Sequence, residues 1–159
     1  MDHYQFNDQL VAGEDGEAYL DAFFRRRGHT ILPVTAEEQR LGIDRVFVTP
    51  TGQSWKVEYK TDFRAGKTGN AFIETVSVDT HGKYGKMGWA LTSTAEYLFY
   101  YVPDHAIYVI PFLSLRHALP RWMREFPARG ALNNRYTTHG VLVPLAQLAE
   151  FSKQTFELP

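Results

Sequence analysis

Asp44 and Glu58 are the first candidates for chemistry, because a predicted β-hairpin places the two carboxylates opposite each other. Two runs of alternating apolar and polar residues, 41–49 and 53–61, are joined by a three-residue connection that ends in Gly52. A connection of this kind is typical of a hairpin loop. Carboxylates facing each other at about 5 Å repel and destabilise a sheet. The pair therefore indicates a place for a divalent cation.

Strand alternation places Lys56 and Lys60 on the same face as the two acids. The opposite, apolar face is predicted to hold Ile43, Phe47, Trp55, Val57 and Tyr59. Both lysines lie diagonal to Asp44 and could neutralise it. A solvated lattice of opposite charges is therefore an alternative interpretation, which only the rest of the chain can distinguish from a metal site.

A third carboxylate, Glu17, is predicted on a helix that precedes the hairpin. This helix is expected to begin at about Asn7 or Asp8, one of which would be its N-cap, and to run to Arg27, with Gly28 ending it. Leu20, Phe23, Phe24 and Arg27 repeat at helical spacing, and one turn back that row reaches Glu17. If Glu17 is directed inward it needs a cation or a metal-bound water, whereas an exposed helical glutamate is the alternative.

The remaining pattern predicts one α+β domain over residues 1–159, with a central mixed sheet flanked by helices. Further strands are expected at 29–34, 71–78, 97–102, 106–110 and 140–143, with loops at 35–40, 63–70, 79–88 and 127–139. A helical turn is expected at 92–96 and helices at 111–124 and 144–153, whose predicted buried residues are Phe112, Leu115, Leu119, Trp122, Leu145, Leu148 and Phe151. Strand 71–78, which carries Glu74, is expected to follow the hairpin as a third antiparallel strand.

Composition removes several classes of protein. The chain has no cysteine, which excludes disulfides and thiolate zinc sites, and its six histidines lack zinc-hydrolase spacing. No phosphate-binding glycine loop is present, so no nucleotide cofactor is expected. The start of the chain lacks signal-peptide character and no apolar run approaches a membrane span, which makes a cytoplasmic protein the expectation. An HNH nuclease, hinted at by Asn133, Asn134 and His139, lacks its paired histidine.

The order of these features resembles the PD-(D/E)XK nuclease superfamily. The resemblance covers roughly residues 13–110 and depends on a helix with Glu17, then Asp44, then Glu58-Tyr59-Lys60. It implies a restriction-endonuclease-like core of order αβββαβ. Residues 60–102 also resemble small phage-type nucleases of this superfamily, which includes enzymes related to Holliday-junction resolvases. One departure is that Gly-Ile-Asp stands where Pro-Asp is common.

The resemblance implies a Mg²⁺-dependent deoxyribonuclease, with Mn²⁺ able to substitute, that acts as an endonuclease on duplex or branched DNA. Asp44, Glu58 and the carbonyl of Tyr59 would be metal ligands. Lys60 would hold the attacking water or stabilise developing charge. Glu17 would bind a second metal or orient metal-bound water. Glu74 is either a further ligand, a supporting acid or an exposed strand residue.

DNA is the expected partner, and a homodimer is inferred from the resemblance alone. The basic residues expected to track phosphates are Lys67, Lys83, Lys86, Arg129 and Arg135. Such contacts give affinity and salt dependence. Two alternatives stay open: a catalytically inactive domain on the same scaffold that binds nucleic acid or a protein partner, and an exonuclease or RNA-directed nuclease with the same metal site.

Overall fold

The computed structural model describes residues 3–80, 83–132 and 136–159, with side chains from Val11 onward except those of residues 80 and 84. The helices are α1 (His3–Arg25), α2 (Ala36–Arg40), α3 (Ala65–Thr68), α4 (Trp89–Thr92), α5 (Phe112–Glu125) and α6 (Leu145–Glu150). The strands are β1 (Thr30–Leu32), β2 (Arg45–Val48), β3 (Ser54–Thr61), β4 (Asn70–Thr80), β5 (Lys83–Met87), β6 (Tyr97–Val102), β7 (Ala106–Pro111), β8 (Ala128–Leu132), β9 (Thr137–Pro144) and β10 (Gln154–Glu157).

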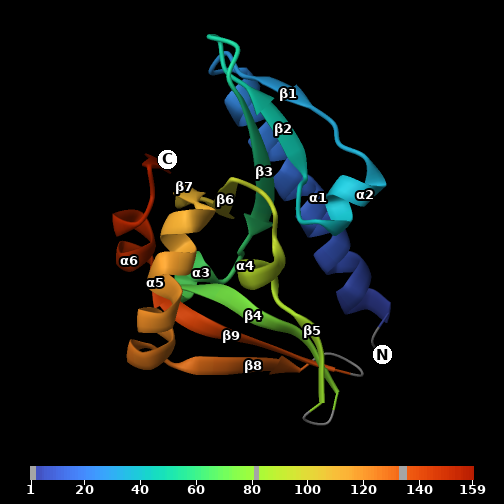
Figure 1. The fold of residues 1–159 in the computed structure, drawn as a ribbon, viewed down its shortest axis with the longest axis vertical. Helices are drawn as coiled ribbons and strands as arrows, with labels where there is room; N and C mark the ends of the chain where they lie inside the picture. Colours follow the sequence, from blue (N-terminus) through green and yellow to red (C-terminus); the bar gives the residue numbers. More distant parts are fainter. Residues whose placement is uncertain (1–2, 81–82, 133–135) are drawn as a thin grey trace.

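The strands form two sheets (Figure 1). The larger has the order β1-β2-β3-β6-β7-β10, in which β3 and β6 are parallel and all other neighbours are antiparallel. The smaller, an antiparallel sheet of order β5-β4-β9-β8, lies at the end of the molecule toward which β3 runs. The prediction of an α+β chain with a mixed sheet flanked by helices is therefore confirmed.

The hairpin register predicted from the loop is confirmed. Thr49 N–H donates to the carbonyl of Gln53 at 2.8 Å, and Gly52 adopts a φ of +86°. Arg45 pairs with Val57 as the predicted register requires, but the pairing ends there. The Asp44 N–H donates to the Val57 carbonyl at 2.8 Å, so the predicted pairing of Asp44 directly opposite Glu58 is not part of the ladder. Ile43 was wrongly assigned to the apolar face.

The reason for that error is local. The chain turns at Gly42, whose φ is +80°, and strand alternation begins only at β2. Ile43 is therefore buried with Leu98 and Tyr100, on the opposite side of the sheet from Phe47 and Val57.

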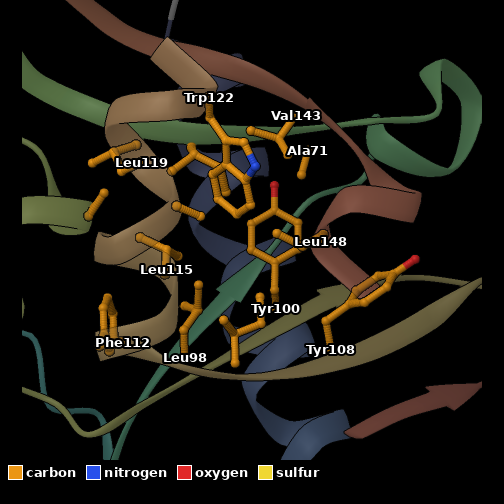
Figure 2. Close-up of a cluster of buried hydrophobic side chains, with 14 of the residues drawn as sticks. Ala71, Leu98, Tyr100, Tyr108, Phe112, Leu115, Leu119, Trp122, Val143 and Leu148 are labelled. Atoms are coloured by element: carbon orange, nitrogen blue, oxygen red, sulfur yellow. The ribbon is translucent and has the colours of Figure 1, made fainter. Parts of the chain in front are cut away.

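The larger sheet is buried on both faces. On one, Leu20, Phe23 and Phe24 of α1 pack against Phe47 and Val57. On the other, α5 and α6 pack against the apolar residues of β6 and β7. Figure 2 shows Trp122, Leu115 and Tyr100 in this second cluster. The predicted buried residues of α5 and α6 are confirmed, except that Phe151 is only partly buried.

Several predicted boundaries were wrong. Helix α1 begins at His3, so residues 7 and 8 lie inside it and cannot cap it. The segment 35–40 is not a loop but contains α2. Thr35 and Glu38 cap the N-terminus of this helix with a reciprocal capping box. Segment 63–70 contains α3, and the helical turn expected at 92–96 is α4, three residues earlier. Strand β10 was not predicted.

The largest correction concerns the residues after the hairpin. Strand β4 is not the third strand beside β3, because β6 takes that position in parallel register. It instead pairs with β9 and β5 in the smaller sheet. The loops expected at 79–88 and 127–139 instead contain strands β5 and β8 and the start of β9. The lysines and glycine of β5, and the alanine, arginine and glycine of β8, gave no local signal for a strand. Within the described residues, no helix is long and apolar enough to cross a membrane.

Candidate active site at the end of strand β3

A glycine brings α1 against the end of β3. Gly16 is buried, and a Cβ added there would overlap the Thr61 hydroxyl and lie only 3.0 Å from the Thr61 Cβ. A glycine costs helix stability, but here it permits the close crossing. The crossing places the next residue of the helix, Glu17, and its neighbour one turn on, Asp21, beside the β2–β3 hairpin.

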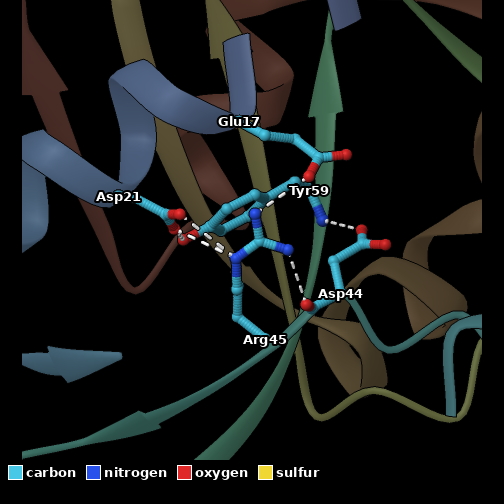
Figure 3. A network of polar contacts seen from close by, with 5 residues as sticks. All are labelled: Glu17, Asp21, Asp44, Arg45 and Tyr59. Carbon is cyan, nitrogen blue, oxygen red and sulfur yellow. Dashed lines mark hydrogen bonds and ion pairs between the residues drawn. The ribbon is translucent and has the colours of Figure 1, made fainter. Parts of the chain in front are cut away.

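Four residues form what we call the paired cluster: Glu17, Asp21, Arg45 and Tyr59 (Figure 3). Arg45 Nη2 lies 3.0 Å from Glu17 Oε2, and Arg45 Nε lies 3.2 Å from both Asp21 oxygens. The Tyr59 hydroxyl donates to Asp21 Oδ1 at 2.9 Å. Arg45 and Tyr59 project from adjacent strands toward α1, so each carboxylate on the helix meets a donor on the sheet.

The paired cluster is electrostatically coupled. Burial raises the pKa of Glu17, nearby Asp44 raises it further, and Arg45 opposes both. Burial raises the pKa of the Tyr59 phenol well above its ordinary value, and Asp21 adds to this effect. The phenol therefore stays a hydrogen-bond donor at physiological pH.

Asp44 is held in place by the same residues. Its Oδ2 accepts from Tyr59 N–H at 2.7 Å, and its carbonyl accepts from Arg45 Nη1 at 2.8 Å (Figure 3). Because the N–H and C=O of one strand residue point to the same side, the Tyr59 carbonyl faces the side on which Asp44 lies. The backbone of β3 thus directs an oxygen toward the Asp44 carboxylate.

Asp44, Glu58, Lys60 and Glu74 form a second group, which we call the open cluster. Glu58 is only 3% exposed, and its Oε1 lies 2.8 Å from Lys60 Nζ. Its Oε2 is buried with no hydrogen-bond donor among the residues that the structure describes. The Ser93 hydroxyl is close enough to lower the Glu58 pKa, but it donates its single proton to the Gly42 carbonyl at 3.0 Å.

The pKa shifts of the open cluster reflect crowding of acids in a buried place. Burial, and then the charge of Asp44, raise the pKa of Glu58, while Lys60 lowers it. Burial alone would lower the pKa of Lys60, but Glu58, Asp44 and Glu74 raise it above its ordinary value. Lys60 therefore stays an ammonium ion.

Glu74 reaches the open cluster from the smaller sheet. Its Oε1 accepts from the N–H of Trp89 at 3.3 Å, and its charge acts on Lys60. Gly88, immediately before Trp89, packs so closely on β4 that a Cβ there would lie 2.5 Å from the Glu74 carbonyl oxygen. The expectation that Glu74 belongs near the site is consistent with this placement, although β4 is not in the predicted sheet.

The donor set suits a hard divalent cation, which prefers oxygen ligands. The unpartnered Oε2 of Glu58, the carboxylate of Asp44 and the Tyr59 carbonyl come from adjoining strands. In the described part of the chain, no three His, Asp or Glu side chains already stand as a ligand group. Lys60, the Tyr59 N–H and Arg45 instead each pair with one carboxylate oxygen, of Glu58, Asp44 and Glu17, respectively.

The predicted phosphate-tracking residues do not converge on this place. Lys67 is exposed on α3, Lys83 and Lys86 are exposed on β5, and Arg129 is exposed on β8. Strands β5 and β8 are the two opposite edges of the smaller sheet. Arg135 lies outside the described residues.

Sequence reasoning missed Asp21 and Arg45. Asp21 lies one helical turn after Glu17, and two acids on a buried helix face need a cation. Arg45 alternates onto the otherwise apolar face of the hairpin, together with Phe47. A charge on an apolar strand face, opposite two inward acids, is the signal that could have found the pair.

Comparison with protein-family models, with curated proteins and with solved structures finds no match to this chain. The functional argument therefore depends on its own residues.

Proposed function

We propose that this protein is a divalent-cation-dependent nuclease of the PD-(D/E)XK kind, which hydrolyses phosphodiester bonds in DNA. The observation that carries the proposal is Glu58, a buried carboxylate with one oxygen paired to Lys60 and the other without a donor among the residues that the structure describes. Burying such an oxygen costs free energy unless a ligand satisfies it. Asp44 on the adjoining strand makes a cation the best candidate.

The arrangement of elements supports the proposal. Helix α1 is followed by the antiparallel strands β1, β2 and β3, and after α3 and α4 the chain returns as β6, parallel to β3. With α2 inserted between β1 and β2, and β4 and β5 inserted before α4, this sequence of elements is compatible with the αβββαβ core that the resemblance implies. The smaller sheet is then an addition to this core. Its strands β4 and β5 lie between β3 and α4 in the sequence, and its strands β8 and β9 follow α5.

Each residue of the site has a role that follows from its surroundings. Asp44, Glu58 and the Tyr59 carbonyl would hold Mg²⁺ or Mn²⁺, which when bound activates water and screens phosphate charge. Lys60 stays protonated, because three acids raise its pKa. It therefore stabilises negative charge on the phosphate or orients the attacking water, and does not act as a general base.

The substrate we propose is duplex or branched DNA, cut internally. Lys67, Lys83, Lys86 and Arg129 are exposed and free to contact phosphates, which favours affinity without sequence reading. A homodimer, which would allow cleavage of two strands, is part of the same proposal.

A second candidate, a binding domain without catalysis, is favoured by a different observation. The carboxylates of Glu17, Asp44 and Glu58 each have a protein partner, so much of their charge is already compensated. Against this candidate stands the second oxygen of Glu58, which is buried without a donor among the described residues.

The test is cleavage of labelled linear duplex, single-stranded, nicked and four-way-junction DNA, and of RNA, with Mg²⁺, Mn²⁺ or EDTA. We compare the wild type with Glu58→Gln and with Glu37→Gln, which removes an exposed acid of α2. The proposal expects metal-dependent cleavage of DNA that is lost only in Glu58→Gln. Binding of DNA without cleavage of any substrate would favour the binding domain, and cleavage of RNA alone would change the substrate class.

A further inference from the structure

We infer that Arg45 is a built-in second cation, so that the site takes one divalent metal ion and Glu17 is not a metal ligand. This inference deepens the proposed function and rests on it. From the sequence, Glu17 would bind a second metal ion or orient metal-bound water, but in the structure its Oε2 lies 3.0 Å from Arg45 Nη2.

The geometry of Arg45 leaves its guanidinium little freedom. Its three nitrogens contact Glu17, both oxygens of Asp21 and the carbonyl of Asp44 at distances from 2.8 to 3.2 Å. The side chain is 19% exposed, and its partner Asp21 is 13% exposed. The planar guanidinium of Arg45 is therefore held by three groups and acts as a positive charge in a fixed position.

That charge lies where a second metal ion would have to bind. A cation on Glu17 Oε2 would stand beside Arg45 Nη2, which is 3.0 Å from the same oxygen, and the two positive charges would repel. A metal ion at Glu17 is therefore disfavoured while Arg45 is present.

The oxygens left over favour one ion, beside Glu58. Oδ2 of Asp44 is taken by the Tyr59 N–H, and Oε1 of Glu58 by Lys60. In the described part of the site, the oxygens with no hydrogen-bond donor include the other oxygen of Asp44 and of Glu58, the Tyr59 carbonyl, and Oε1 of Glu17, whose side chain is 39% exposed. Oε1 of Glu17 belongs to the carboxylate whose Oε2 lies 3.0 Å from Arg45 Nη2, so the fixed guanidinium charge would also repel an ion at Oε1.

The experiment counts Mn²⁺ ions per chain by calorimetric titration and by electron paramagnetic resonance of free Mn²⁺, without DNA. Wild type is expected to bind one ion. Arg45→Met should bind a second, because Glu17 and Asp21 lose their cation, whereas Arg45→Lys keeps the charge and should bind one. The double variant Arg45→Met/Glu17→Gln should return to one.

A second variant keeps the test decisive if Arg45→Met does not fold, which circular dichroism would reveal. Glu17→Gln should bind one ion, with a Kd raised by no more than about 10–100-fold, as for a group that only supports the ligands. Two ions in the wild type, falling to one in Glu17→Gln, would overturn the inference but leave a nuclease site. No bound ion in the wild type would instead refute the proposed function, and the inference with it.

Discussion

The paired cluster and the open cluster flank the same strand, β3, and treat their carboxylates differently. On the α1 side, Glu17 and Asp21 meet Arg45 and Tyr59 with every contact between 2.9 and 3.2 Å. On the other side, Glu58 is more deeply buried, and in the described part of the chain one of its oxygens has no donor. In the paired cluster, the acids contact donors of the chain itself, and these contacts join α1 to the sheet. In the open cluster, one acid oxygen lacks such a donor, so a ligand is expected there.

The largest effect that would sharpen this contrast is loss of Lys60. Lys60→Met should lower cleavage by about 10²–10³-fold, the cost of removing one preorganised donor from an active site. Lys56→Met removes an exposed lysine from the same face of β3 and should cleave at the wild-type rate. Initial rates at saturating Mg²⁺ measure both. Equal losses would mean that Lys60 acts through net charge alone.

The next effect concerns stability, because a ligand that binds only the folded chain stabilises it. Mn²⁺ at a hundredfold excess over its Kd should add about 2.7 kcal/mol to the free energy of unfolding of the wild type. Glu58→Gln should show no such gain, whereas Asp21→Asn, in the paired cluster, should keep it. Urea unfolding with Mn²⁺ or EDTA measures the difference. Stabilisation that survives in Glu58→Gln would break the contrast between the clusters.

A third effect tests how α1 reaches both clusters. Gly16→Ala should destabilise the fold by about 1–3 kcal/mol, because its Cβ overlaps the Thr61 side chain in a packed crossing. Gly13→Ala has no neighbour within 4 Å and should stabilise α1 by about 0.5–1 kcal/mol. Thermal melts of both variants measure this. A neutral Gly16→Ala would show that α1 can move away from β3 at no cost.

The smallest effect is expected within the paired cluster itself. Tyr59→Phe removes one hydrogen bond to Asp21, which keeps Arg45, so it should cost only about 1 kcal/mol and leave Mn²⁺ affinity unchanged. Tyr136→Phe, at an exposed tyrosine, is the matched control. Urea midpoints and Mn²⁺ titration decide between them. A large loss of metal affinity in Tyr59→Phe would join the two clusters into one site.

Local sequence signals predicted the hairpin and helix α5 correctly. The loop ending in Gly52 fixed the register of the hairpin from Val48 to Arg45, because a loop of that length admits few backbone paths. It did not indicate that the pairing ends before Asp44. The apolar row of α5 likewise identified its buried face, since helical periodicity depends on the helix alone. The capping box at Thr35 and Glu38 is an equally local signal, and it indicates the start of α2.

The smaller sheet could not be read in the same way. Strands β5 and β8 contain lysine, glycine and alanine, which have little intrinsic preference for strands. They are strands because β4 and β9 offer them partners that are distant in sequence. Glu74 reaches the site by this long-range route, so its place beside Lys60 was open from sequence. Arg45 escaped notice because its partners lie on a different element.

The parallel pairing of β3 with β6 has a consequence for how the chain folds. Val57 pairs with Tyr97, and the intervening segment holds α3, β4, β5 and α4. Closing so long a connection is entropically costly and slow. We expect the β1–β2–β3 meander to form early and β6 to dock late. Since β6 supplies Leu98 and Tyr100 beside Glu58 and Lys60, the face that carries the proposed chemistry would be completed among the last steps of folding.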